Sequence, residues 1–259
     1  MTKVFVHGNP ETAAIWGPLV DALVAGGLED EVVTVSPPGF GAPSPEGWDP
    51  TPASYVAWLG ERLEAIDGPI DLVGHDWGAG HVYGLLSAAP ELIRSWAADC
   101  AGLLHPDYVW HDMAQVWQTP DAGEEAVAAM TALGAEARQE AYEGLGLPAE
   151  IAASMALAAD EEMGRCVLGL YRGARQPARA ELGRELSDAA LPPGLVLDAT
   201  DDPYVASELG ARMVSRLEAS HLRLEGLSHW WMTEDPTAAV EGLLGFWSGL
   251  DAGTNGGGS

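Results

Sequence analysis

The sequence has little that indicates a metal, a disulfide framework or a bound nucleotide. Only two of its 259 residues are cysteine, Cys100 and Cys166, and they lack CxxC or other ligand spacing. No GxxxxGK[ST] or GxGxxG segment is present to hold phosphates. No uninterrupted apolar run approaches the roughly 20 residues that cross a bilayer. We therefore expect no metal, no cofactor and no membrane span.

Basic residues are also scarce, and this bears on partners. Twelve Lys and Arg face 39 Asp and Glu, which gives a formal charge of −27. Such a charge repels nucleic acid and anionic lipid, so neither is expected to bind. The strand pattern Val4–Val6 starts so early that no signal peptide fits before it, and a cytoplasmic location is expected. Monomer and homodimer both stay open.

Short apolar runs alternate with helical patterns at both ends of the chain. The runs predicted as strands are Val4–Val6, Val32–Val35, Ile70–Val73, Ile93–Ala98 and Leu195–Leu197. The segment after Thr51-Pro52 has a helix start signal followed by apolar residues at helical spacing. This alternation predicts an α/β fold with a mostly parallel sheet flanked by helices, and a site beyond the carboxyl ends of the strands.

The strand signal disappears between about residues 103 and 191. Ala-rich helical stretches replace it, and they end at Pro192-Pro193-Gly194, a strong breaker before the next strand. We interpret residues 103–191 as an inserted helical cap on a core made of residues 1–102 and 192–250. The Gly-rich segment 251–259 is predicted to be a flexible tail.

The most informative motif is Gly74-His75-Asp76-Trp77-Gly78, which follows the strand pattern Ile70–Val73. Strand, small-residue turn and helix are the context of a nucleophile elbow, in which the central side chain is exposed. Here that residue is Asp76 rather than serine. Asp is also a common turn residue, but the surrounding pattern favours the elbow.

An aspartate nucleophile implies a particular chemistry. An ionised carboxylate needs no base to attack an sp³ carbon, and the product is an alkyl ester. Water must then cleave that ester, which requires a histidine base and an acid to orient it. Strained epoxides and carbon–halogen bonds are suitable electrophiles.

Later segments supply candidates for these roles. Asp201-Asp202-Pro203 follows the strand Leu195–Leu197, and His229 lies between a strand and a helix that starts near Asp235-Pro236. The chain order of nucleophile, acid and histidine fits such a triad. The loop His7-Gly8-Asn9-Pro10 ends the first strand, so its N–H groups and that of Trp77 are expected to hold an oxyanion.

Together these motifs resemble the epoxide hydrolase and haloalkane dehalogenase group of the α/β-hydrolase superfamily over nearly the whole chain. The segments that carry the resemblance are His7–Pro10, Pro38-Gly39-Phe40-Gly41, Gly74–Gly78, Asp201–Pro203 and His229–Pro236. The resemblance implies Asp76 as nucleophile, His229 as base and Asp202, just before a proline, as the acid. Asp99 is the alternative acid, because some dehalogenases place theirs after that strand.

The two branches of this group differ in how they steady the leaving group. Dehalogenases hold the halide with N–H donors, for which Asn9 and Trp77 match the family pair. Epoxide hydrolases protonate the alkoxide with two cap tyrosines, of which Tyr171 resembles the second. No tyrosine occupies the place of the first cap tyrosine, near Trp117. Two substitutes are therefore considered: Tyr108 as the proton donor to an epoxide, or Trp117 as an indole N–H donor to a halide.

These residues place epoxide hydrolysis slightly ahead of dehalogenation. A small apolar substrate, epoxide or organohalide, is expected under the cap. A non-catalytic small-molecule binder is a third hypothesis, which the apparently complete set of Asp76, His229 and Asp202 disfavours.

Overall fold

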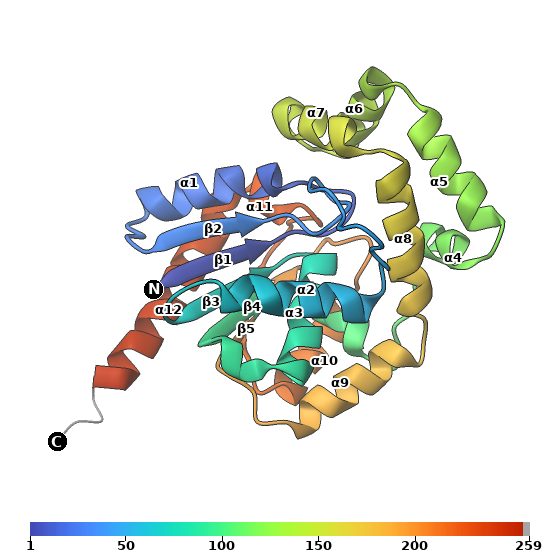
Figure 1. The fold of residues 1–259 in the computed structure, drawn as a ribbon. Helices are drawn as coiled ribbons and strands as arrows, with labels where there is room; N and C mark the ends of the chain where they lie inside the picture. The colour runs from blue at the N-terminus through green and yellow to red at the C-terminus, as the bar shows by residue number, and fades with distance from the viewer. Residues whose placement is uncertain (256–259) are drawn as a thin grey trace.

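A computed structural model describes residues 1–255, with side chains through residue 252. Within that range it holds a six-stranded sheet in the order β2-β1-β3-β4-β5-β6, with every pair parallel (Figure 1). The strands are β1 (Thr2–Val6), β2 (Glu31–Val35), β3 (Ile70–Gly74), β4 (Ser95–Ala98), β5 (Gly194–Ala199) and β6 (Ser220–Leu224). The predicted α/β class and parallel sheet are confirmed.

Side chains of alternate strand residues fill two separate apolar cores, one on each face of the sheet. Val4 and Val6 belong to one core and Phe5, between them on β1, belongs to the other. Adjacent strand residues point to opposite faces, so a strand that is covered on both sides reads as a continuous apolar run. This is why the strands were recognisable without alternation of polar and apolar residues.

Helices cover both faces. On the face of Phe5 lie α1 (Gly17–Ala25) and α12 (Val240–Asn255), and on the opposite face lie α2 (Pro52–Glu64), α3 (Trp77–Ala88) and α10 (Ser207–Arg216). The start of α2 is the one predicted, since the Thr51 hydroxyl accepts a hydrogen bond from the Ser54 N–H at 3.2 Å. Helix α12 runs five residues beyond the boundary predicted at residue 250, and residues 256–259 of the predicted tail lie outside the described residues.

The segment between β4 and β5 is helical, as its composition predicts. It contains α4 (Asp112–Gln118), α5 (Ala122–Ala132), α6 (Ala135–Gly144), α7 (Ala149–Ala158), α8 (Glu161–Gly173) and α9 (Ala178–Asp188). Figure 1 shows α4 to α8 standing beyond the ends to which the strand arrows point. Helix α9 instead packs on α3 of the core, so the chain returns to the core well before residue 191.

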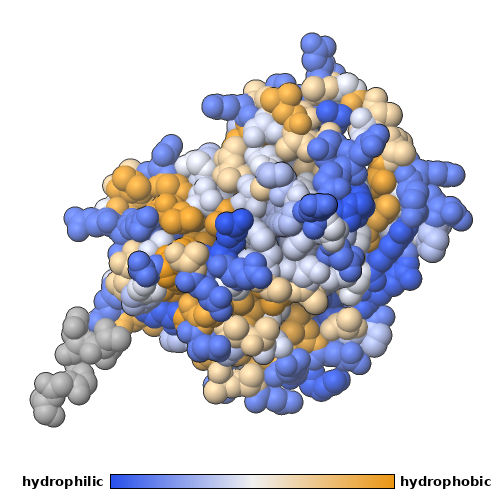
Figure 2. All heavy atoms as spheres, in the orientation of Figure 1, coloured by the Kyte–Doolittle hydropathy of each residue, from blue (hydrophilic) through white to orange (hydrophobic). Residues whose placement is uncertain are grey.

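The outer surface is mostly hydrophilic in the view of Figure 2, with apolar residues in smaller areas between charged ones. No helix within residues 1–255 has the length and apolar character needed to cross a membrane.

A buried ion pair ties β1 to its neighbour β3. The Lys3 ammonium, fully buried, lies 2.6 Å from an Asp71 carboxylate oxygen, and these two residues are register partners. Asp71 also accepts hydrogen bonds from Arg94 and Ser95. Because buried charges are tolerated when they are paired and hydrogen-bonded, this cluster can sit at the amino end of the sheet, opposite the strand ends where the site forms.

The turn after β3 depends on close backbone contact with β1. A Cβ on Gly78 would lie 2.1 Å from the Val6 carbonyl oxygen, and one on Gly74 would lie 2.8 Å from the Ala79 nitrogen. Both positions therefore require glycine for lack of space.

We predict that Gly78→Ala lowers the free energy of unfolding by roughly 1–3 kcal/mol, because the strand or the turn must move to admit the methyl group. Gly245→Ala in α12 is the matched control, since nothing lies within 4 Å of its Cβ position. Alanine there should be neutral or stabilising by up to about 1 kcal/mol. Urea titrations of both variants measure this, and equal stability of the two would contradict the packing explanation.

Candidate active site

Asp76 lies at the sharp turn between β3 and α3, as the elbow motif predicts. Its backbone has φ 51° and ψ −118°, a conformation that is strained for a residue with a side chain. The neighbouring His75 N–H donates to the Val6 carbonyl at 3.1 Å and holds the turn against β1. The carboxylate is therefore presented at the carboxyl edge of the sheet.

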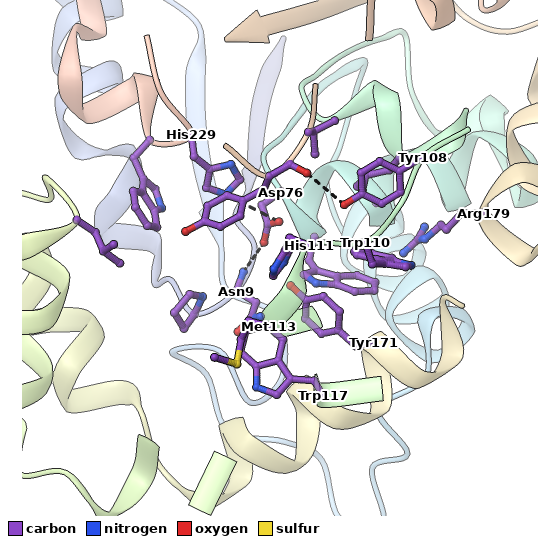
Figure 3. Close-up of a pocket in the computed structure, with 18 of the residues that line it drawn as sticks. Asn9, Asp76, Tyr108, Trp110, His111, Met113, Trp117, Tyr171, Arg179 and His229 are labelled. Atoms are coloured by element: carbon purple, nitrogen blue, oxygen red, sulfur yellow. Dashed lines mark hydrogen bonds and ion pairs between the residues drawn. The ribbon is translucent and has the colours of Figure 1, made fainter. Parts of the chain in front are cut away.

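The two oxygens of Asp76 have different surroundings. Oδ2 accepts a hydrogen bond from the Asn9 backbone N–H at 2.9 Å (Figure 3), whereas Oδ1 lies 3.9 Å from Nε2 of His229. Gly8 faces the same oxygen, because a Cβ there would lie 2.2 Å from Oδ2 and 2.6 Å from the Trp77 nitrogen. Burial raises the pKa of Asp76 to about 6, against the opposing charge of His229.

His229 is held by Asp202. Its Nδ1 lies 2.9 Å from Asp202 Oδ2, and Asp202 Oδ1 in turn accepts the Tyr204 N–H at 2.7 Å. Burial lowers the pKa of His229, but the charge and hydrogen bond of Asp202 outweigh it and leave that pKa above its ordinary value. Nε2 is thus directed at Asp76 by a partner on the opposite side of the ring.

Asp99, the alternative acid, is directed elsewhere. One of its oxygens binds Nδ1 of His75 at 2.5 Å and the Trp231 indole N–H at 2.9 Å, and the other accepts the Asp76 backbone N–H at 2.9 Å. Among the described residues Asp99 makes no hydrogen bond to His229. It supports the turn that carries Asp76.

Glu11 completes a buried network that sequence reasoning missed. The fully buried His75 lies between Asp99 and Glu11, with its Nε2 3.0 Å from Glu11 Oε1. Glu11 also accepts the Trp230 indole N–H at 2.8 Å and the Gly8 N–H at 2.9 Å. The only signal in the sequence was an acidic residue directly after the His7–Pro10 loop.

The charges in this network reinforce one another. Burial disfavours a charged His75, but the charges of Asp99 and Glu11 raise its pKa well above the ordinary value. Burial likewise opposes ionisation of Glu11, yet the charge of His75 lowers its pKa to about 2. An imidazolium between two carboxylates therefore lies directly beneath Asp76.

Within the described part of the chain, two groups of side chains have the spacing of metal ligands: Glu11 with His75 and His229, and Cys100 with Asp202 and His229. Ligand histidines must be neutral with a free ring nitrogen. In the first group both nitrogens of the charged His75 are bound to carboxylates, and in the second Nδ1 of His229 is bound to Asp202. Hydrogen bonding within the network accounts for both groups.

A cavity of about 200 Å³ lies over Asp76, between the strand ends and the inserted helices. Its lining includes Trp77 and also Asn9, Trp117, Tyr171 and His229, the last four of which Figure 3 labels around Asp76. Met113 and Leu145 also line it and are 48% and 54% exposed, so they mark its mouth. Its walls are largely aromatic, which suits a small organic molecule.

Tyr171 lies close to the two donors that the resemblance assigns to a halide. Its ring is 5.0 Å from that of Trp77, edge to face. Burial and the charge of Asp76 raise the pKa of Tyr171 well above its ordinary value, while hydrogen bonding from the side chains of Trp77 and Asn9 opposes this rise. The hydroxyl therefore keeps its proton at neutral pH, beside both donors.

The substitutes considered for the missing tyrosine have other contacts. The Tyr108 hydroxyl lines the cavity but donates to the Tyr204 carbonyl at 3.3 Å. Trp117 packs on Tyr171 with ring centroids 4.8 Å apart. The structure also brings in the hydroxyls of Tyr142 and Tyr204, of which Tyr142 is buried without a partner among the described residues.

Comparison with known proteins identifies the family of the chain. The model of the alpha/beta hydrolase family matches residues 4–243, almost the entire length. The chain belongs to the α/β-hydrolase family. No curated protein matches the sequence significantly. The match of this α/β-hydrolase to the family model spans both core segments and the helices between them.

Two similar solved structures are both hydrolases. Haloalkane dehalogenase DbeA from Bradyrhizobium elkani has 19% identity and a TM-score of 0.75 over 97% of this chain and 91% of its own. E-2-(acetamidomethylene)succinate hydrolase has 19% identity and a TM-score of 0.71 over 95% of this chain and 91% of its own. At this identity the likeness shows the shared fold.

The two acids should respond differently to neutralisation. Asp99→Asn is predicted to lower the free energy of unfolding by about 3–5 kcal/mol, because it removes one of two anions that compensate a buried imidazolium. Asp202→Asn keeps the acceptor for Tyr204 and should cost only about 1 kcal/mol. Urea titration of each variant tests this, and a larger loss for Asp202→Asn would overturn the assignment of Asp99 as the structural acid.

Proposed function

We propose that this α/β-hydrolase opens an electrophilic sp³ carbon through a covalent alkyl ester on Asp76, with epoxides as the favoured substrates. The observation that carries the proposal is the arrangement of Asp76 itself. One oxygen is held by a backbone N–H, and the other faces the aromatic cavity and His229. That is the geometry that a carboxylate nucleophile needs.

In the first step, Oδ1 of Asp76 attacks the carbon and the ring C–O bond breaks. Oδ2 stays in its hydrogen bond with Asn9 and becomes the carbonyl oxygen of the ester. The Asp76 pKa near 6 leaves most of the carboxylate ionised at neutral pH, and its burial removes water that would weaken the attack.

In the second step, water attacks Cγ of the Asp76 ester. Nε2 of His229 takes the proton, and Asp202 stabilises the resulting imidazolium through Nδ1. The negative charge that develops on Oδ2 is met by the Asn9 N–H. Protonation of the leaving alkoxide by His229 restores Asp76 and releases the diol.

Tyr171 is the feature that favours an epoxide. The opening ring develops negative charge on its oxygen. The neutral phenol of Tyr171, beside Asp76, can donate a hydrogen bond and then its proton to that oxygen. Tyr171 regains a proton from the water that hydrolyses the ester. The Tyr108 hydroxyl donates its hydrogen bond to the Tyr204 carbonyl, so in this proposal Tyr171 is the only proton donor to the epoxide oxygen.

Dehalogenation is the second candidate, supported by a separate observation. Asn9 and Trp77 converge on one side of the cavity, where their N–H groups could hold a departing halide. The structural similarity to a haloalkane dehalogenase also supports this reaction. Both reactions share Asp76, His229 and Asp202, so the two candidates differ only in the leaving group.

We predict that His229→Gln accumulates the covalent ester, because the attack does not use His229 whereas hydrolysis does. Intact-protein mass spectrometry then distinguishes the substrates: an epoxide adds its full mass, and a haloalkane adds its mass less that of HX. The double variant Asp76→Asn, His229→Gln is the control and should carry no adduct. The mechanism is contradicted if wild type turns a substrate over but the His229→Gln variant forms no adduct with it. If wild type binds such molecules but turns none of them over, the hypothesis of a non-catalytic binder is supported instead.

Tyr171→Phe is predicted to lower kcat for epoxide opening by roughly 100-fold or more, since it removes a general acid. Halide release from bromoalkanes should change by less than about threefold, because a halide needs no proton. Steady-state assays of diol formation and halide release on the same preparations measure both. Tyr108→Phe serves as the matched control, and an epoxide rate unaffected by Tyr171→Phe would refute the role of this tyrosine.

A further inference from the structure

Arg179 is a buried cation in the wall of the active-site cavity. Arg179 lies on α9, is only 5% exposed and lines the cavity. Figure 3 shows its side chain reaching toward Trp110, on the side of the cavity away from His229. The catalytic scheme above makes no use of it.

Among residues 1–252 the Arg179 guanidinium has no hydrogen bond and no ion pair, although Asp76 lines the same cavity. Its Nε is fully buried without an acceptor, and its recorded contact is a cation–π interaction with Trp77, 4.8 Å from the ring centroid. Such a contact supplies about 2 kcal/mol, whereas removing a cation from water costs several kcal/mol. Burial lowers the pKa of Arg179 to about 10, against the opposing charge of Asp76, so Arg179 is still charged at neutral pH.

The surrounding backbone makes room for this cation. A Cβ on Gly80, in the first turns of α3, would lie 3.3 Å and 3.5 Å from the two terminal nitrogens of Arg179. Glycine inside a helix costs about 1 kcal/mol relative to alanine. On α9, a Cβ at Gly183 would lie 2.2 Å from the Leu104 carbonyl oxygen, so this helix is fixed closely against the core. The guanidinium is therefore packed closely against α3 in the cavity wall.

Trp110 adds a second unused donor in the same wall. Its indole nitrogen is buried without a partner among the described residues, and its ring stacks on that of Trp77 at 6.0 Å. Buried donors are normally satisfied, and unsatisfied ones that line a cavity are satisfied by what occupies it. Arg179 and Trp110, both packed on Trp77, thus call for an acceptor within the cavity.

We propose that Arg179 forms an anion subsite and that the natural substrate carries one carboxylate, held there while Asp76 attacks a second position of the same molecule. A planar guanidinium matches a carboxylate in two parallel hydrogen bonds. A single cation compensates one negative charge, and Asp76 in the same cavity is itself negative, so a dianion such as a phosphate monoester is disfavoured. The expected substrate is therefore a short halo- or epoxy-carboxylate rather than a purely apolar molecule.

The reaction balances with this substrate. For a halocarboxylate, the bond from Oδ1 of Asp76 to carbon forms as the carbon–halogen bond breaks and halide leaves; water then returns Asp76 and gives the hydroxycarboxylate and one proton. For an epoxycarboxylate, the ring oxygen keeps the electron pair and is protonated. The carboxylate on Arg179 takes no part in bond changes. This inference rests on the proposed function for the position of the reacting carbon, but not for anion binding.

Binding of butyrate, which has no electrophilic carbon, tests the subsite without turnover. Wild-type protein should bind butyrate at least tenfold more tightly than the neutral isostere butyramide, measured by isothermal titration and by quenching of tryptophan fluorescence. Arg179→Met should abolish this preference and leave butyramide binding unchanged. Arg184→Met, on an exposed position of the same helix, should behave as wild type. Equal affinity of wild type for butyrate and butyramide overturns the proposal.

Thermal unfolding separates a binding arginine from a structural one. Removing an uncompensated buried charge should leave the Tm of Arg179→Met equal to or above that of wild type. A lower Tm with unchanged butyrate affinity would identify a structural residue and overturn the proposal. If the variant does not fold, the comparison of butyrate with butyramide on wild type still decides.

Turnover of 2-bromobutyrate and 2,3-epoxybutyrate against their amides links the subsite to catalysis. Wild type should favour the carboxylates by at least about 100-fold in kcat/KM, and Arg179→Met should lose that preference. Selective butyrate binding without any Asp76 adduct would overturn the proposed function while supporting the subsite. Adduct formation from neutral substrates only, with no butyrate preference, would support the function and overturn the subsite.

Discussion

The strained turn at Asp76 is the constraint on which the site depends. A side chain at a positive φ angle is held there by contacts on several sides: Gly78 against Val6, the His75 N–H on the Val6 carbonyl, and Asp99 on the Asp76 N–H. These contacts place the carboxylate at the strand ends with one oxygen bound and the other free. A looser turn would let the residue relax into ordinary backbone geometry and withdraw the nucleophile.

The electrostatics beneath this turn explain how several charges can share one buried region. His75 is an imidazolium compensated by Asp99 and Glu11, while His229 is hydrogen-bonded to Asp202 through Nδ1. The charge of His75, and that of His229 when it is protonated, opposes the effect of burial on the Asp76 pKa. The network keeps the nucleophile ionised near neutral pH without placing a cation in contact with its attacking oxygen.

The cavity above combines aromatic walls with a cation that the protein does not neutralise. Apolar walls alone would favour an alkyl epoxide or halide, the small apolar substrate that the family resemblance implies. Arg179 changes the expected chemistry, because an uncompensated charge in such a cavity is costly unless a ligand shares it.

The sequence by itself determined the fold class and the segments that form the site. Apolar runs identified five of the six strands within residues 1–255, because the inner strands are covered on both faces, whereas the edge strand β6 is largely exposed and was not among the predicted runs. The small residues around Asp76 identified the turn. Only the tertiary structure decided which acid meets His229, since Asp99 and Asp202 both follow strands and differ only in where their loops point. Glu11 and Arg179 lie far in sequence from the groups they meet, and nothing in local patterning reports burial or a missing partner. Those properties arise when distant segments pack together.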